Sequence, residues 1–201
     1  MAVDRYECLK VLTGLLEEDD IVVNLGIGAT HFELWQLRPA PSSASMGKLG
    51  GTVALGLGIA IALPDNRVVV VTTDGDLLME LGQLSPIADQ DPKNLKIIVL
   101  DNQYYESLET PRPTLTAGKL DLAGIAKASG IKKTATVDSL EEFETLLTEW
   151  LEISEPVCLV VKTNRGKSNA PERLIDHIED KYRFVRWVEQ RHGLDIIPKK
   201  R

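Results

Sequence analysis

The sequence predicts a single α/β domain with a doubly wound, mainly parallel sheet flanked by helices. Hydrophobic runs rich in β-branched residues alternate along the chain with segments of helical period. Three of these runs are apolar over several consecutive residues, which is typical of strands covered on both faces. The alternation favours parallel strands joined by right-handed crossovers. A chain of 201 residues suits one substantial domain better than two, so residues 1–201 are expected to form one unit.

Strands and helices are expected to follow one another along the chain. The strands are predicted at Ile21–Asn24, Val68–Thr73, Leu95–Asp101, Thr134–Val137 and Val157–Lys162. The helices are predicted at 31–37, 49–63, 77–90, 121–129, 138–152 and 171–191. Pro64-Asp65-Asn66 indicates a turn between a helix and a strand. Asp138 with Glu141 resembles a capping box at the start of the helix that follows.

Residues 171–201 are expected to form a helical C-terminal extension of the domain. Val185 and Val188 share one face at helical spacing, and Phe184 and Trp187 share a neighbouring face. Packing within the chain is the expected role of these faces, and a contact with another subunit is the alternative. Structural or surface roles are expected for two histidines of this segment, His177 and His192.

Composition excludes several classes of function. The net charge of −7 provides no basic field, so nonspecific nucleic-acid binding is not expected. The longest uncharged run, residues 49–64, is shorter than the about 20 residues that span a bilayer, and the acidic first twenty residues do not resemble a signal peptide. Cys8 and Cys158 form no metal or redox motif, and Cys158 is expected to be a buried thiol. A cytoplasmic protein that does not bind membranes is therefore predicted.

Polar residues follow two neighbouring predicted strands. Thr73-Asp74-Gly75-Asp76 comes after one strand, and Asp101-Asn102 comes after the next. Asp74 and Asn102 would offer hard oxygen ligands of the kind Mg²⁺ prefers, and Gly75 would allow close approach of a phosphate to the backbone. The alternative for Asp74 is an ordinary helix cap after a strand. Ligands of doubly wound sheets bind beyond the carboxyl ends of the strands, where four unusual segments are expected: 24–28, 73–76, 101–105 and 163–166.

The two motifs resemble the thiamine diphosphate signature, a Gly-Asp-Gly turn followed slightly under thirty residues later by an Asn-Asn-type pair. Here Asp74 and Asn102 are 28 residues apart. Ala44-Ser45-Met46-Gly47, a Gly/Ala-rich helix and the run from Leu63 to Val70 strengthen the resemblance. Together they are similar to the diphosphate-binding domain of 2-oxoacid decarboxylases. The nearest resemblance is to sulfopyruvate and phosphonopyruvate decarboxylases, especially the separate beta subunit of the former, from about Asn24 to Lys162.

The resemblance implies a thiamine diphosphate-binding fold and a role for each residue that matches the signature. The Asp74 and Asn102 side chains would hold Mg²⁺, with the backbone carbonyl of Tyr104 as a third ligand. Gly75 and Asp76 would offer backbone contacts to the diphosphate.

Three other residues are candidates for the cofactor or the substrate. Met46 matches the bulky apolar residue that keeps the cofactor bent, and core filling is its alternative. His31 would lie near the reacting carbon, or would be a surface or helix-start histidine. Lys48 would pair with the anionic end of a substrate, or would be a solvated lysine. The irregular segment from Tyr104 to Lys119 is long enough to be functional. Tyr104 and Tyr105 would form a lid with the following loop, or one of them would instead pack under that loop.

The sequence departs from the family pattern at three positions. Thr73 stands where the first Gly is usual, so the turn must avoid a conformation that only Gly tolerates. Asp76 stands where Ser or Ala is common, and its carboxylate must point to solvent, a metal-bound water or a cation. Asp101 replaces the first Asn of the usual pair. These changes affect geometry and affinity more than the class of cofactor.

The resemblance also implies that half of an active site is absent from this chain. Full-length members of the family have a second domain that binds the aminopyrimidine and supplies an activating glutamate. A pyrimidine-binding subunit of the alpha type is therefore the expected partner in a hetero-oligomer, with self-association also possible. The resulting lyase would decarboxylate a small anionic 2-oxoacid. The alternatives are a noncatalytic cofactor-binding scaffold and a subunit of a 2-oxoacid oxidoreductase, the latter disfavoured by the lack of an iron–sulfur cysteine cluster.

Overall fold

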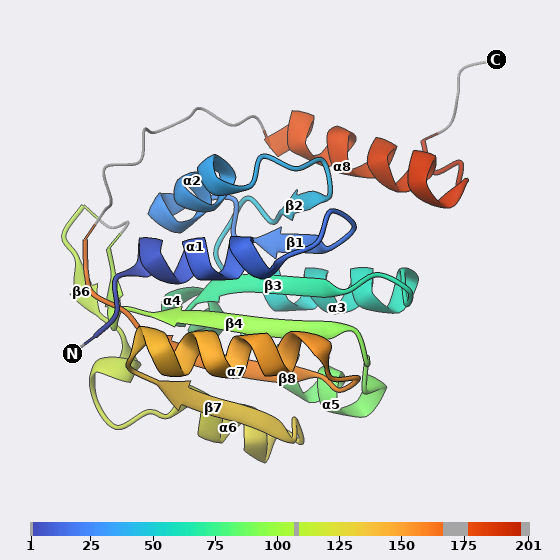
Figure 1. The fold of residues 1–201 in the computed structure, drawn as a ribbon. Coiled ribbons are helices and arrows are strands. Elements are labelled where there is room, and N and C mark those ends of the chain that lie inside the picture. Colours follow the sequence, from blue (N-terminus) through green and yellow to red (C-terminus); the bar gives the residue numbers. More distant parts are fainter. Residues whose placement is uncertain (1, 107–108, 167–176, 198–201) are drawn as a thin grey trace.

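The computed structural model describes residues 2–106, 109–166 and 177–197. Its centre is a six-stranded parallel sheet in the order β2-β1-β3-β4-β8-β7 (Figure 1). The strands are β1 (Ile21–Asn24), β2 (Ser43–Ser45), β3 (Val68–Thr73), β4 (Leu95–Asp101), β7 (Lys133–Val137) and β8 (Val157–Lys162). The chain runs outward from β1 to β2 and returns to β3 on the other side of β1, so the predicted doubly wound sheet is confirmed.

Helices cover both faces of the sheet (Figure 1). One face packs against α1 (Arg5–Leu15), α2 (Gly28–Leu37) and α7 (Leu140–Glu152). The other packs against α3 (Thr52–Ala62), α4 (Asp74–Met79), α5 (Leu84–Gln90), α6 (Leu122–Ala128) and α8 (His177–His192). The strands β3 and β4 are consequently buried along nearly their whole length, as their continuous apolar sequences predict.

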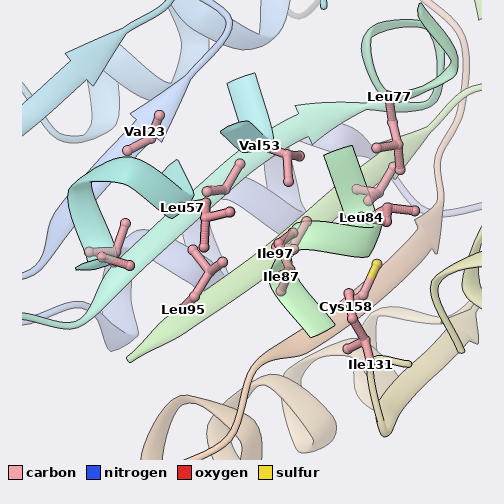
Figure 2. Packing of buried hydrophobic residues seen from close by; sticks show 14 of the residues in the cluster. Val23, Val53, Leu57, Leu77, Leu84, Ile87, Leu95, Ile97, Ile131 and Cys158 are labelled. Carbon is pink, nitrogen blue, oxygen red and sulfur yellow. The ribbon is translucent and has the colours of Figure 1, made fainter. Parts of the chain in front are cut away.

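Close packing between α3 and the sheet forms the centre of one hydrophobic core. Figure 2 shows Val53 and Leu57 of α3 above Leu95 and Ile97 of β4. Leu77 joins the same cluster from α4 and is fully buried. The short helix α4, which begins at the predicted metal ligand Asp74, is therefore anchored to the core by its own apolar residue.

The elements that were not predicted from the sequence include helix α1 and strand β2. Helix α1 is capped by Asp4, whose Oδ1 accepts hydrogen bonds from the Tyr6 N–H (2.8 Å) and the Glu7 N–H (3.1 Å). It is also joined to α2 by a buried ion pair between Arg5 and Glu33 (2.7 Å). Strand β2 has three residues, two of them serines, and is defined by its pairing with β1 rather than by its own composition.

Several predicted helix boundaries were wrong: α2 begins at Gly28 rather than at residue 31, and α3 begins at Thr52 rather than at residue 49. The helix expected at 77–90 begins earlier, at Asp74, and is interrupted at Glu80, whose backbone leaves the helical region (φ −145°, ψ 60°) before the 3₁₀ turn η1 (Leu81–Gln83) and α5. The predicted capping box at Asp138 is displaced by one residue: Ser139 caps α7, and its Oγ accepts a hydrogen bond from the Glu142 N–H (3.2 Å).

The C-terminal helix packs on the edge of the same domain, as expected. Val188 is buried in the core cluster, with Phe184 and Trp187 packed against it. Asp180 accepts a hydrogen bond from the hydroxyl of Ser45 in β2 (3.2 Å), and His192 lies edge-on to the Trp187 ring. Residues 171–176 of the predicted helix and the side chain of His177 lie outside the described part of the chain.

Both cysteines are free and buried, as predicted for Cys158, and burial raises the pKa of each thiol to about 12. Thiols held in the protonated form are poor metal ligands and nucleophiles. Within the described residues, no helix is both long and apolar enough to cross a membrane.

Candidate active site at the carboxyl edge of the sheet

The predicted motifs meet at one edge because the strands that precede them are paired in register. Thr73 at the end of β3 lies opposite Leu100 of β4, so Asp74 leaves the sheet beside Asp101. Asn24 at the end of β1 lies opposite Ser45 of β2, which places the Met46 segment next to the β1 turn. This edge includes the point between β1 and β3 where the direction of winding reverses, the usual ligand site of doubly wound sheets.

Asp74 is fully buried, and its two carboxylate oxygens have different surroundings. Its Oδ2 accepts hydrogen bonds from the hydroxyls of Thr114 (2.7 Å) and Thr116 (3.2 Å). Within the described part of the chain, no hydrogen bond reaches its buried Oδ1. Burial raises the pKa of Asp74 to about 6, and the charge of Asp101 adds to this, while the hydrogen bonds from Thr114 and Thr116 and the nearby Gly75 N–H oppose it. A buried carboxylate oxygen without a donor is costly, and a divalent cation fits this position.

Asp101, the departure from the usual Asn, is neutralised by a partner on the next strand. Lys162 lies opposite it at the end of β8, and the Lys162 Nζ donates a hydrogen bond to Asp101 Oδ2 (2.5 Å). The other oxygen accepts from the Thr116 hydroxyl (2.7 Å) and the Gln103 N–H (3.0 Å). The Thr116 hydroxyl lies between the two carboxylates, and its single proton favours the shorter contact with Asp101 over the longer one with Asp74. The Lys162 ammonium compensates the extra negative charge of Asp101.

Asn102 is positioned by a sharp turn. Gln103 adopts a left-handed conformation (φ 65°), and the Asn102 Oδ1 accepts a hydrogen bond from the Tyr104 N–H (2.9 Å). An amide oxygen has a second lone pair, so this contact leaves capacity for a metal ion. The turn leads into a small antiparallel hairpin, β5 (Tyr104–Tyr105) with β6 (Arg112–Pro113), which is followed by the 3₁₀ turn η2 (Leu115–Ala117) that contains Thr116.

The two tyrosines pack within the site. A Cβ on Gly75 would lie 2.7 Å from Cε1 of Tyr105, so the Tyr105 ring rests directly on the glycine. The Tyr104 ring is covered by the guanidinium of Arg165, 3.6 Å from the ring centre, and Arg165 also pairs with Glu106 (2.9 Å). The two rings therefore pack against Gly75 and Arg165, and the expected lid stays a prediction.

The departures at Thr73 and Asp76 are both accommodated. Thr73 has an ordinary extended backbone (φ −121°), and its hydroxyl accepts a long hydrogen bond from the Asp76 N–H (3.3 Å). The Asp76 carboxylate is fully buried and accepts hydrogen bonds from the Gly50 N–H (2.6 Å) and the Thr72 hydroxyl (2.5 Å). Of the three expected surroundings, solvent was wrong, because the carboxylate is buried and two neutral donors contact it; a metal-bound water or a cation stays a prediction.

The Met46 segment continues the pairing between β1 and β2. The Met46 N–H donates to the Asn24 carbonyl (2.9 Å) and the Gly47 N–H to the Leu25 carbonyl (2.7 Å). Gly26 has φ +78°, and a Cβ there would lie 2.8 Å from the Gly47 nitrogen, so this close approach requires glycine. Met46 is half-buried at this edge and lies outside both buried core clusters.

The two residues proposed for substrate chemistry differ in their surroundings. His31 is buried in α2, and its Nδ1 lies 2.6 Å from the Asn24 Oδ1, which also accepts the Gly26 N–H (2.8 Å). Because that oxygen is an acceptor, Nδ1 carries the proton in this contact. The surface alternative for His31 was wrong. Lys48 is exposed, and within the described residues it has no hydrogen bond or ion pair.

The residues that support the predicted ligands could not be identified from the sequence. Thr114 and Thr116 contact Asp74 from 40 and 42 residues away, and no local pattern marks them. Lys162 could have been inferred only from the strand order, because it is the register partner of Asp101.

Comparisons with known proteins identify the family. A family model described as thiamine pyrophosphate enzyme, C-terminal TPP binding domain, matches residues 25–161. The chain belongs to this family, whose cofactor is also called thiamine diphosphate. The resemblance drawn from the motifs is thereby confirmed.

Several named relatives cover most of this chain. It is 33% identical over 189 residues to the sulfopyruvate decarboxylase subunit beta of Methanothermobacter thermautotrophicus, covering 94% of this chain and 97% of that protein. The corresponding subunit of Methanocaldococcus jannaschii is 32% identical, with 90% and 94% covered. The phosphonopyruvate decarboxylase of Streptomyces viridochromogenes is 33% identical, with 81% of this chain but 40% of that protein covered.

Solved structures agree with the fold. A putative thiamin diphosphate-dependent enzyme from Mycobacterium smegmatis superposes with a TM-score of 0.70 at 25% identity, covering 82% of this chain and 32% of that one. Benzoylformate decarboxylase from Polynucleobacter necessarius gives a TM-score of 0.68 at 19% identity, covering 81% and 33%. The expected thiamine diphosphate-binding fold is confirmed.

Proposed function

We propose that the chain is the diphosphate-binding subunit of a thiamine diphosphate- and Mg²⁺-dependent decarboxylase. Its substrate would be a 2-oxoacid with a second anionic group, of the sulfopyruvate or phosphonopyruvate type. The family membership and the decarboxylase relatives support this activity. The single observation that carries the metal assignment is the buried Oδ1 of Asp74, to which no hydrogen bond is directed from the described residues.

The residues at the carboxyl edge fit the cofactor that the family uses. Asp74, the Asn102 side chain and the Tyr104 carbonyl would hold Mg²⁺, and the Gly75 and Asp76 backbone would contact the diphosphate. The Asp76 N–H is held by Thr73 only over a long distance, so a phosphate oxygen could compete for it. Met46, half-buried beside this turn, would support the cofactor in its bent form.

The cofactor, when bound, supplies an electron sink for the carbon that loses CO₂. The chain's own residues would hold and orient the reactants. Buried Asp74 would keep the metal ion and the diphosphate in place, and the hairpin with Tyr105 packed on Gly75 would exclude water from that turn. Lys48, exposed and without a partner within the described residues, would attract the anionic end of the substrate. His31 would face the reacting carbon through its Nε2 side, since Nδ1 contacts Asn24.

A second subunit is required by this proposal. The sulfopyruvate decarboxylase relatives are named as beta subunits and match this chain over nearly their full length, which supports an alpha-type partner that binds the pyrimidine. A hetero-oligomer would then complete the active site. The buried free thiols support the proposed cytoplasmic location, because such compartments keep cysteines reduced.

Turnover is expected only when this chain is mixed with a pyrimidine-binding subunit, thiamine diphosphate and Mg²⁺. The measurement is CO₂ release from sulfopyruvate, phosphonopyruvate and pyruvate, with each subunit alone as a control. One of the two anionic substrates should be preferred over pyruvate, because pyruvate lacks the second charge. The partner subunit must first be shown to be active when it is mixed with another beta subunit. If this chain, mixed with that partner, binds the cofactor but decarboxylates none of the three substrates, the proposal is contradicted and a noncatalytic scaffold is favoured.

The substitution Lys48→Met tests the substrate assignment in the same assay. It is expected to raise the KM for the preferred anionic substrate about tenfold and to change the KM for pyruvate little, as expected for the loss of one charge-assisted contact. Lys119→Met, which removes another exposed lysine, is the matched control. An equal effect of Lys48→Met on both substrates would exclude the proposed charge recognition.

A further inference from the structure

Asp76 joins two segments that are far apart in sequence. Its Oδ1 accepts a hydrogen bond from the Gly50 N–H (2.6 Å), and its Oδ2 accepts one from the Thr72 hydroxyl (2.5 Å). Gly50 belongs to the loop that follows Met46, whereas Thr72 and Asp76 flank the Asp74-Gly75 turn. All three residues are buried, so the contact forms away from competing water.

The loop at residues 46–51 has little conformational preference of its own. Gly47, Gly50 and Gly51 all adopt left-handed conformations, with φ of 77°, 77° and 86°. Glycine loses more conformational freedom on ordering than any other residue, so such a loop needs tertiary contacts to stay in one place. The backbone contacts of Met46 with Asn24 in β1 and of Gly47 with Leu25 just after it fix the first half. The contact between Gly50 and Asp76 fixes the second half.

We propose that the Asp76 carboxylate is a positioning residue that fastens the Met46 loop to the Asp74-Gly75 turn. It thereby holds the second half of the loop, where the Met46 side chain packs against Gly51, next to the turn that would bind the metal and diphosphate. The inference rests on the proposed cofactor site. It also explains why a carboxylate is tolerated there: both of its oxygens are directed at donors from the protein.

Substitutions of Asp76 should change the affinity for the cofactor in opposite directions, depending on whether the carboxylate acts by positioning the loop or only by its charge. If the fastening matters, Asp76→Ala weakens cofactor binding, because the loop is released. Asp76→Asn keeps an acceptor oxygen for the Gly50 N–H and should restore most of the affinity. If only charge matters, both variants remove repulsion from the diphosphate and both tighten binding.

The experiment combines hydrogen exchange with cofactor titration. In the protein without cofactor, Asp76→Ala should increase amide exchange of residues 47–51 at least about tenfold, while Asp76→Asn should stay within a few-fold of the native protein. With thiamine diphosphate and Mg²⁺, and with the partner subunit where it is needed for binding, Asp76→Ala should raise the Kd about tenfold or more.

Each outcome supports or overturns the proposal. Unchanged exchange at 47–51 in Asp76→Ala, or a uniform increase throughout the chain, would exclude a local fastening. Tighter cofactor binding by both variants would assign Asp76 a purely electrostatic effect. Should Asp76→Ala fail to fold, Thr72→Val removes one of the two donors and is expected to give a smaller change confined to the same loop. Failure of the native protein to bind cofactor would contradict the proposed function, and the exchange measurement would still test the loop contact.

Discussion

Asp74→Asn is expected to lower the affinity for thiamine diphosphate in the presence of Mg²⁺ by at least about 100-fold, since even supporting residues of metal sites cost 10–100-fold when changed. The amide keeps an oxygen for the Thr114 and Thr116 hydroxyls, so the local structure should persist. It lacks the negative charge that a hard divalent cation requires. Because burial of the native carboxylate raises its pKa to about 6, replacing it should leave the stability of the cofactor-free protein unchanged or higher.

Calorimetric titration measures the affinity, and the unfolding midpoint in urea measures stability. Asp138→Ala is the matched control, because Asp138 also follows a strand of the same sheet but is exposed. It should bind the cofactor as the native chain does. Native-like binding by Asp74→Asn would remove Asp74 from the metal site, and equal losses in both variants would show that the effect is not specific to this position.

Gly56→Ala is expected to destabilise the protein by about 2 kcal/mol or more, although alanine favours helices. Gly56 lies on the buried face of α3, and a Cβ there would be 2.1 Å from the Cγ2 of Val70 in β3. The helix must move away from the sheet or Val70 must leave its rotamer, and either change loosens the core shown in Figure 2.

Gly58→Ala on the same helix provides the control. Gly58 is exposed, and a Cβ there has no other atom within 4 Å. This substitution should stabilise the protein by about 0.5–1 kcal/mol, the difference in helix propensity. The free energy of unfolding in urea distinguishes the two variants. A stabilising effect of Gly56→Ala would show that α3 does not pack on β3 as described.

The sheet could be predicted because its strands are defined by local composition. Continuous apolar runs such as Val68–Thr73 and Val157–Lys162 are recognisable without knowledge of their partners. Strand β2 could not be recognised in this way, because Ser43-Ala44-Ser45 becomes a strand only through pairing with β1. Helix α1 was missed although Asp4 is a good capping residue, and its buried face and its ion pair with Glu33 involve residues far away in the sequence.

In the candidate site, too, residues marked by a local sequence pattern could be predicted, and residues brought in by distant contacts could not. The motifs at Asp74 and Asn102 could be predicted because each directly follows a strand, and the ends of adjacent parallel strands must meet. The groups that satisfy these residues could not be predicted. Thr114 reaches Asp74 through a hairpin, and Gly50 reaches Asp76 through a loop with left-handed glycines. Such contacts depend on loop conformation, which has no periodic signal in the sequence.

This edge of the sheet would hold thiamine diphosphate through a divalent cation. The decisive experiment is a calorimetric titration of thiamine diphosphate into the native chain, alone and mixed with its pyrimidine-binding partner. Each titration is performed once with Mg²⁺ and once with EDTA. We predict saturable binding with Mg²⁺ in at least one of the two preparations and its loss in EDTA. Absence of binding in both preparations, or equal binding with and without the cation, would contradict the account.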